Sequence, residues 1–510
     1  MSNQSSDNNR RIAKNTALLY FRMLFLMFIG LFTSRVNLQS LGVDNFGIYN
    51  VVGGVVAMFS IFTGSMAVAI SRDITYELGK GNKEKLNLVF SSAVTIQIFM
   101  AIIILVIAEI AGVWFLNNKM VIPPDRLYAA NWVLQFSIAL FVLNLICVPY
   151  NACIIAHEKM SAFAYITIYE ALMKLVIAYS VFITPFDKLI TYAALLLFLA
   201  LSMRLIYGVY CARKFEECHY RFVFDKKMLK QMGGFAGWTM IGNLAWVGYS
   251  QGLNILLNLF FGPSVNAARG VAMQVNDKVS SFATNFQMAL NPQITKSYAS
   301  NDLDRMHTLI YASSKFSYFM LLMLSLPIMI ETPSILHYWL GNYPDHSVWF
   351  VRLIFMVLMI DAMANSLTVG AQANGNIKKY QIVVGTILLL IVPISYMALK
   401  MGFPPESVFV VHLAIVILAQ CSRLYMIRGM IELSIGEYIQ KVVLRVGIVT
   451  ALSVIVPVFL HNWLQSNFIN MLIVCLVSCM SVAICVYFLG LNKSERLKVN
   501  NKLIHVLHKG

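Results

Sequence analysis

The sequence consists of long apolar stretches separated by short polar loops. A helix needs about 20 mostly apolar residues to cross the hydrocarbon of a bilayer. The pattern predicts six such helices in the first half of the chain, at residues 14–36, 47–70, 87–116, 127–149, 161–184 and 189–212. It predicts eight more in the second half, at 233–261, 267–290, 307–330, 347–370, 380–400, 406–427, 442–461 and 468–491. The expected fold is therefore an all-α polytopic membrane protein with about fourteen transmembrane helices.

The longest predicted cytoplasmic connection, residues 213–232, is basic and aromatic and follows the sixth helix. Such a segment is typical of a linker that lies partly in the membrane interface. It divides the chain into an N-lobe of six helices, residues 1–212, and a C-lobe of six helices, residues 233–430. We expect two extra helices within residues 431–491 and a basic cytoplasmic tail over residues 492–510.

The composition excludes a soluble protein. Hydrophobic residues make up 59% of the chain and charged residues only 12%, about half of the charge that soluble domains carry. The net charge of +16 would suggest nucleic-acid binding in a soluble protein, but cytoplasmic loops of membrane proteins carry the same excess. Lys and Arg concentrate in alternate loops, and the other set holds only Lys119, Arg126, Lys188 and Lys400. Both termini are thus predicted to be cytoplasmic, with no nucleic-acid partner.

The cysteines predict neither a disulfide framework nor a metal site. They lie mostly inside or at the ends of apolar stretches, without CxxC spacing or neighbouring His residues. The eight positions are Cys147, Cys153, Cys211, Cys218, Cys421, Cys475, Cys479 and Cys485.

An internal repeat relates the two lobes at an offset of 220 residues. The segment LGVDNFGIYNVV aligns with FGPSVNAARGVA, and AISRDITYELGKGNKEKL aligns with ALNPQITKSYASNDLDRM. Identical pairs without a gap are Gly42/Gly262, Val51/Val271, Ser60/Ser280, Phe62/Phe282, Ala69/Ala289 and Ile74/Ile294. Because six helices separate the copies, both start on the same side of the membrane. This predicts a parallel repeat, an arrangement in which transporters place a cavity between their lobes.

These segments and the twelve-plus-two helices resemble the polysaccharide-transport branch of the MATE-like (MOP) superfamily. They most resemble bacterial flippases (Wzx-type) for undecaprenyl-linked O-antigen or capsule repeat units, and the extra C-terminal helices are similar to those of lipid II flippases. The resemblance implies a monomer in the bacterial inner (cytoplasmic) membrane that moves a lipid-linked oligosaccharide outward by alternating access. It also implies contacts with membrane lipids and with glycan assembly enzymes. We expect no enzymatic activity and no cofactor beyond a coupling H⁺ or Na⁺.

Charged and polar residues inside the predicted helices are the candidate site. A charge at mid-bilayer costs at least about 2.5–3.5 kcal/mol, so it indicates a function. Cationic side chains can replace the hydration of a pyrophosphate, and amides and hydroxyls can bind sugars. The candidate substrate-binding residues are Arg22, Arg35, Lys174, Asn243, Ser250, Asn254, Arg269, Asn276, Lys278, Ser280 and Gln287. The candidates for charge balance or ion coupling are Glu170, Asp277 and Asp361.

Spacing adds detail to these candidates. Arg269, Asn276, Ser280 and Gln287 fall within ~20° of one line on a helix, which predicts a polar stripe facing water or a ligand. The alternative is a stripe that only satisfies neighbouring helices. Glu170 and Lys174 are four residues apart, so they can equally form a structural ion pair. Charged residues nearer the helix ends are expected to snorkel to the headgroups; these are Arg204, Lys315 and Arg423.

Two other functions fit parts of the pattern. A MATE-type multidrug/cation antiporter would share the fold, but Arg22, Lys174, Arg269 and Lys278 inside the helices favour an anionic substrate. A membrane glycosyltransferase could use Asp302-Leu303-Asp304 as a DxD-like metal motif. The repeat weakens that hypothesis, because the matching loop has Asn82-Lys83-Glu84, and short motifs match often by chance.

Overall fold

The computed structural model describes residues 2–500 apart from 43–44, 47, 50–51, 54–55, 57–58, 119–121, 224, 466, 494 and 498–499. Within these residues the regular structure is helical and no strand occurs, which confirms the all-α prediction. Eleven helical stretches of the described chain are long and apolar enough to cross a membrane. The predicted spans 47–70, 233–261 and 267–290 do not correspond to any of these stretches, so a count of fourteen stays a prediction. The first of them lies partly outside the described residues, as does the predicted basic tail.

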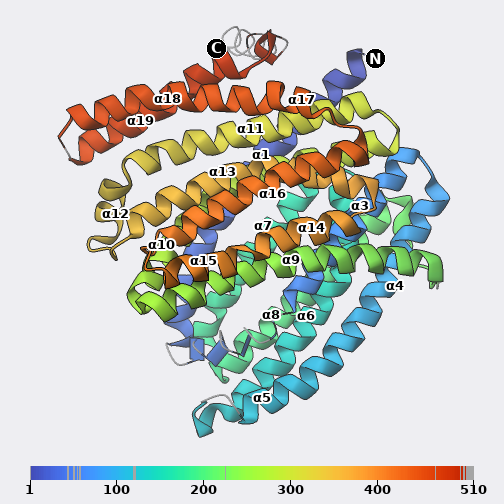
Figure 1. Ribbon diagram of the computed structural model, residues 1–510. Coiled ribbons are helices and arrows are strands. Elements are labelled where there is room, and N and C mark those ends of the chain that lie inside the picture. The colour runs from blue at the N-terminus through green and yellow to red at the C-terminus, as the bar shows by residue number, and fades with distance from the viewer. Residues whose placement is uncertain are drawn as a thin grey trace, which may run out of the picture. The chain divides into compact units, whose positions relative to one another are not determined.

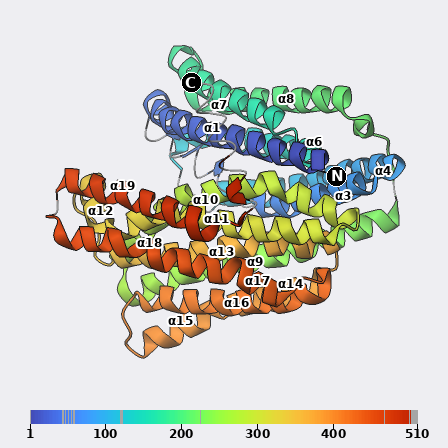
Figure 2. The same ribbon diagram turned by 90° about the horizontal axis from the view of Figure 1, so that it is seen from above.

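One compact unit comprises Met1–Asn243 and Thr295–Asn301. Here α6 packs against α3, α4 and α8, while α1 packs against α7, and Figure 2 shows α1 and α7 as neighbouring helices. Buried aliphatic residues of α6 such as Val133, Leu134 and Ile138 form the core. The helices are α1 (Ser2–Leu41), α3 (Ser60–Lys80), α4 (Lys83–Ile107), α5 (Val113–Asn118), α6 (Leu127–Ala156), α7 (Met160–Ile183), α8 (Lys188–Lys214) and the first part of α9 (Lys226–Phe261).

The other compact unit comprises Leu244–Ile294 and Asp302–Gly510. Here α13 packs against α11 and α16, and the C-terminal helices α18 and α19 pack against each other and against α11, as Figure 1 shows. The helices after α9 are α10 (Pro263–Ala299), α11 (Leu303–Ile330), α12 (Thr332–Leu340), α13 (Ser347–Asn374), α14 (Lys378–Leu389), α15 (Ile391–Lys400), α16 (Ser407–Ile431), α17 (Ile435–Tyr438), α18 (Leu444–Trp463) and α19 (Phe468–Cys485).

The turns that follow matching helices confirm the repeat. Gly42 ends α1 with φ of 78°, and Gly262 ends α9 with φ of 80°. At the far end of the next helix, Gly81 and Asn301 have φ of 71° and 58°. Glycine and, less often, asparagine adopt this left-handed conformation at low cost. The repeat therefore preserves backbone conformation even where the side chains differ.

Matching helix caps extend the repeat and explain the acidic triplet. The side chain of Asn82 accepts a hydrogen bond from the Lys85 backbone N–H at the start of α4, at 3.1 Å. The side chain of Asp302 accepts one from the Arg305 backbone N–H at the start of α11, at 3.2 Å. Asn and Asp are both favoured N-cap residues because their side chains accept from such free N–H groups. Asp302 thus has a structural role that its repeat partner shares.

Candidate functional site

Each unit contains a pocket lined by charged and polar side chains. We call the pocket of the first unit the N-pocket; its volume is about 320 Å³. The C-pocket, in the second unit, has a volume of about 220 Å³. The polar lining of the N-pocket consists of Tyr49, Thr63, Asn144, Asn151, Glu170, Lys174 and Tyr207. That of the C-pocket consists of Trp246, Tyr249, Ser250, Arg269, Asn276, Asp277, Ser280, Asp361 and His412.

In the N-pocket the charges neutralise each other. Glu170 and Lys174 lie one turn apart on α7, and the Lys174 ammonium contacts the Glu170 carboxylate at 2.6 Å. The Lys174 side chain is 48% exposed, and ion pairs this accessible contribute little to stability. The structure therefore forms the pair that the four-residue spacing allows, next to the amides of Asn144 and Asn151 on α6.

Arg22 of α1 lies beside the N-pocket and is held by α7. Its Nε donates a hydrogen bond to Thr167 Oγ1 at 2.6 Å. Its guanidinium lies 4.4 Å from the centre of the Phe163 ring, within cation–π range. It is also close enough to Glu170 and Tyr207 to interact with them electrostatically. Arg22 thus contributes positive potential to this pocket from a fixed position.

In the C-pocket a buried arginine is positioned by a neighbouring helix. Arg269 of α10 is only 6% exposed. Its Nη1 donates to Asn254 Oδ1, and its Nη2 donates to the Ser250 carbonyl at 3.0 Å and the Ser250 hydroxyl at 3.3 Å. Its Nε has no hydrogen-bond partner among the described residues. Ser250 and Asn254 on α9, both predicted site residues, therefore orient the guanidinium and leave its Nε–H without a partner within that part of the chain.

Two carboxylates from different helices line the C-pocket together with Arg269. Asp277 extends from α10 and is exposed, with Asn276 donating to its Oδ1 at 3.4 Å. Asp361 extends from α13, is half-buried, and interacts electrostatically with Arg423 of α16. Arg423 is 8% exposed, and its Nε and Nη1 find no hydrogen-bond partner in the part of the chain that the structure describes. The C-pocket thus has a wall of mixed charge, and buried guanidinium N–H groups without a described partner lie in it at Arg269 and beside Asp361 at Arg423.

Six predicted site residues lie outside the linings of both pockets as the structure describes them: Arg22 and Asn254, whose contacts are given above, and four others. Arg35 of α1 and Lys278 of α10 are exposed elsewhere on their helices. Asn243 donates to Ser65 Oγ of α3 at 3.0 Å within the first unit. Gln287 is buried and donates to the Ala362 carbonyl at 2.7 Å, so the last residue of the predicted stripe packs against α13.

Of the three end-of-helix cations expected to snorkel, Lys315 and Arg423 are buried in the protein, whereas Arg204 is half-buried. Lys315 is 3% exposed and pairs with Glu495 at 2.7 Å. Arg204 donates to the Tyr150 hydroxyl at 3.0 Å, and Arg423 is buried as described above. Lys315 and Arg423 interact with Glu495 and Asp361 on distant segments, and such partners could not be placed from the local sequence.

Sequence reasoning missed His412 and Tyr249 of the C-pocket. The His412 ring lies 5.1 Å from the Tyr249 ring, and neither ring nitrogen has a hydrogen-bond partner within the described residues. A single His in an apolar stretch has no informative spacing. The repeat is the signal that could have found His412. At the 220-residue offset His412 matches Tyr192, and Arg269 matches Tyr49. The rings of Tyr49 and Tyr192 contact each other edge-to-face at 4.9 Å between centres.

Comparisons with known proteins agree with this architecture. The sequence profile of the family described as "Polysaccharide biosynthesis protein" matches residues 12–298. A search of curated protein sequences finds no match. Among solved structures, the crystal structure of a MATE mutant aligns with a TM-score of 0.70 at 13% identity, over 82% of this chain and 96% of that chain.

Two further structures align over the same shares, 82% of this chain and 96% of each of theirs. An outward-facing multidrug resistance MATE transporter of the MOP superfamily has a TM-score of 0.68 at 13% identity. A MOP superfamily transporter from Pyrococcus furiosus also has a TM-score of 0.68 at 13% identity. That transporter is described as having a binding pocket of reversed polarity that suggests a different function. At this identity the likeness establishes the fold. The chain is a multi-pass membrane protein that belongs to the polysaccharide biosynthesis protein family and has the fold of the MATE transporters of the MOP superfamily.

Proposed function

We propose that the protein is a flippase for undecaprenyl-pyrophosphate-linked oligosaccharide repeat units of O-antigen, capsule or exopolysaccharide. It would move them from the inner to the outer leaflet of the bacterial inner membrane by alternating access, with both termini cytoplasmic. The family is one of polysaccharide biosynthesis, and the fold is that of transporters. The observation that carries the proposal is Arg269, a buried guanidinium held by α9 whose Nε–H has no partner within the described chain.

The chemistry of the substrate requires such a group. Its pyrophosphate carries at least two negative charges between a long lipid and a sugar head, and it cannot enter hydrocarbon without replacing its hydration. A guanidinium binds phosphate oxygens through parallel N–H groups in one plane. Arg269 supplies such N–H groups in the C-pocket and Arg423 adds positive charge beside Asp361, while Asn276 and Ser280 can bind sugar hydroxyls.

We assign the carboxylates to charge balance. Asp277 and Asp361 offset Arg269 and Arg423 while the C-pocket is empty, since uncompensated charge inside a membrane protein is costly. Transport is then driven by membrane potential or by consumption of the product, although a coupling H⁺ or Na⁺ at these carboxylates is the alternative. The mechanism needs no cofactor and no chemical step, so we propose that the protein is not an enzyme. We also propose that it acts as a monomer.

A cation antiporter is the second candidate, and one observation favours it. The C-pocket brings Asp277 and Asp361 together with Trp246 and Tyr249. Carboxylates beside aromatic rings are the surroundings that an organic cation prefers. The buried Arg269 argues against this occupant, because it would repel a cation inside the same pocket.

Reconstituted vesicles test the proposal. A fluorescent lipid-linked oligosaccharide placed in one leaflet should reach the other leaflet with the protein present, and a membrane-impermeant quencher reports its arrival. Arg269→Ala should stop this movement, and Arg269→Lys should retain part of it. Lys278→Ala on the same helix, outside the pocket lining, is the matched control and should move substrate normally.

The opposing results are equally clear. Full flipping by the Arg269→Ala protein would contradict the anion-binding role of this residue. Uptake of an organic cation that the Asp361→Asn change abolishes, without any movement of the lipid-linked sugar, would establish the antiporter instead.

A further inference from the structure

Three buried side chains with metal-ligand chemistry meet at the end of α6 in the first unit. Cys153 lies in the last turn of α6, and Glu217 and Cys218 lie in a short 3₁₀ helix (Glu216–Cys218) that follows α8. The Cys153 and Cys218 sulfur atoms are 3.5 Å apart. One carboxylate oxygen of Glu217 and the two sulfur atoms all lie within 4.8 Å of one another. These residues are far apart in sequence, so the spacing of cysteines along the chain does not reveal them.

Further groups complete the surroundings. The Cys211 thiol of α8 interacts with Cys218 and donates to the Tyr150 carbonyl at 3.6 Å. His157 Nε2 pairs with Glu217 Oε1, and the His157 ring stacks on Phe215 at 4.1 Å between centres. A third sulfur atom therefore contacts Cys218 at the edge of the cluster, and a ring nitrogen orients the carboxylate.

The distance between the sulfur atoms distinguishes two uses of a cysteine pair. Two thiolates bound to one tetrahedral Zn²⁺ at about 2.3 Å lie about 3.8 Å apart. A disulfide needs about 2.05 Å between sulfur atoms. The observed 3.5 Å is close to the first value, and a metal ion could enter with only small shifts of side chains.

We propose that Cys153, Cys218 and Glu217, with Cys211 as the fourth ligand, form a site for a thiophilic divalent metal ion of the Zn²⁺ type. Sites with three or four sulfur ligands are typical of structural zinc. His157 does not bind the ion; its hydrogen bond fixes the orientation of Glu217, as outer partners of metal ligands commonly do. This inference is independent of what the protein transports.

Binding of an ion would displace protons from the thiols, whereas the carboxylate is already anionic. The hydrogen bond with Cys153, followed by burial, raises the pKa of the Cys218 thiol. Burial also pushes the pKa of Glu217 upward, but the hydrogen bond from His157 and nearby positive charge outweigh it and lower that pKa. Glu217 is therefore ready as an anionic ligand, and binding of the ion would release the thiol protons to solvent.

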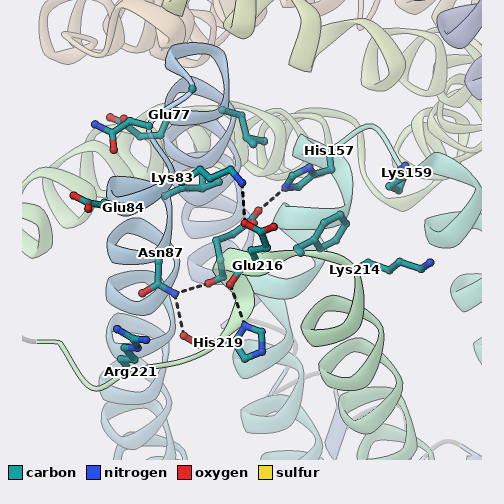
Figure 3. Close-up of a pocket in the computed structure, with 16 residues that line it drawn as sticks. Glu77, Lys83, Glu84, Asn87, His157, Lys159, Lys214, Glu216, His219 and Arg221 are labelled. Atoms are coloured by element: carbon teal, nitrogen blue, oxygen red, sulfur yellow. Dashed lines mark hydrogen bonds and ion pairs between the residues drawn. The ribbon is translucent and has the colours of Figure 1, made fainter.

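A surface pocket provides a path for the ion. This pocket of about 970 Å³ is lined by both His157 and Glu217. Figure 3 shows His157 directed toward the segment that carries Glu216, with Lys83 at the rim paired to Glu216 at 2.9 Å. Solvent ions can thus approach the carboxylate side of the cluster from outside the helix bundle.

The expected consequence is mechanical. The segment after α8 leads toward α9, and Asn87 of α4 already donates to the Glu217 and His219 carbonyls at 2.8 and 3.0 Å. An ion would add bonds from this segment to α6 and α8. The bound ion would then hold the start of the connection 213–232 against α6 and α8.

The test measures metal and not transport. We would purify the full chain in detergent under reducing conditions, remove metal with a chelator, and titrate Co²⁺, whose thiolate complexes absorb visible light. We expect one equivalent to bind with a thiolate spectrum and Zn²⁺ to displace it. Cys153→Ser and Cys218→Ser should each lower the affinity at least tenfold, and Cys421→Ser, which changes an exposed cysteine of the other unit, should bind normally.

Two results would overturn the proposal. One is the absence of a stoichiometric thiolate spectrum in the wild-type protein, or its persistence in both serine variants. The other is the loss of two titratable thiols without bound metal, which would show a disulfide. If a serine variant does not fold, Glu217→Gln serves instead: it keeps the shape of the side chain and should weaken Co²⁺ binding while the thiolate bands remain.

Discussion

The N-pocket and the C-pocket share one repeat position in their linings but differ in chemistry. At the same repeat position the first has Tyr49 and the second has Arg269. Tyr49 packs its ring against Tyr192, whereas Arg269 donates hydrogen bonds to Ser250 on the neighbouring helix. The duplication kept the turns and helix caps, because these depend on backbone conformation. The lining side chains were free to diverge, and a buried guanidinium arose in only one of the two linings that the structure describes.

The acidic groups differ in the same way. Glu170 and Lys174 of the N-pocket neutralise each other on one helix. Asp277 and Asp361 of the C-pocket come from two helices, and Arg423 comes from a third. A pair on one helix is formed whatever the neighbouring helices do. A group spread over three helices changes when those helices move, so we expect the C-pocket to respond to substrate more strongly.

The largest expected effect tests the difference at the repeat position. Hydrogen bonds to charged groups contribute about 1.5–3 kcal/mol, which is roughly a 10- to 150-fold change. Arg269→Ala should therefore lower the flipping rate at low substrate concentration by at least tenfold, and Tyr49→Phe should change it less than twofold. Equal losses in the two variants, measured in the same vesicles, would show that the pockets act alike.

The second effect concerns stability. Asp361→Asn removes the negative charge that offsets Arg423, and breaking a buried pair typically costs about 3–5 kcal/mol. Because Asp361 is half-buried, we expect about 2–3 kcal/mol, seen as a lower unfolding temperature in detergent. Glu170→Gln in the exposed pair should cost less than about 1 kcal/mol. A larger loss of stability for Glu170→Gln than for Asp361→Asn would contradict the expectation that the charges of the C-pocket are the more strongly coupled.

A smaller effect is expected at Asp277, which is exposed to the C-pocket. Asp277→Asn should tighten the binding of an anionic substrate about two- to fivefold, the size of a solvent-exposed charge interaction, and slow its release. The dependence on imposed pH or Na⁺ gradients should stay as in the wild type. Loss of that dependence with unchanged affinity would make Asp277 a coupling residue.

The smallest effects should be equal in the two units. Asn82→Ala and Asp302→Ala each remove a matching N-cap and should each cost about 1 kcal/mol. Asp302→Asn keeps a capping side chain and should leave both stability and flipping unchanged. Abolished activity in the Asp302→Asn protein at normal stability would favour the glycosyltransferase hypothesis, since a DxD motif needs its carboxylate.

Much of the site could be predicted because polar residues inside a membrane helix are conspicuous. Arg269, Asp277 and Asp361 stand out against an apolar background, and all three line the C-pocket. Gln287 and Asn243 stand out equally, yet they bond to the neighbouring helices α13 and α3. The sequence pattern gives the polarity of a residue, but not whether a neighbouring helix already forms hydrogen bonds with its side chain.

The sequence by itself determined that the chain is a helical membrane protein with a repeat, and it indicated which polar residues to consider. Those features depend on local properties: hydrocarbon requires about 20 apolar residues per crossing, and left-handed turns favour Gly or Asn. Only the tertiary structure decided that Lys315 pairs with Glu495, and that Cys153 meets Cys218. Contacts of this kind join residues far apart in the chain, and they arise from the packing of whole helices, which no local pattern specifies.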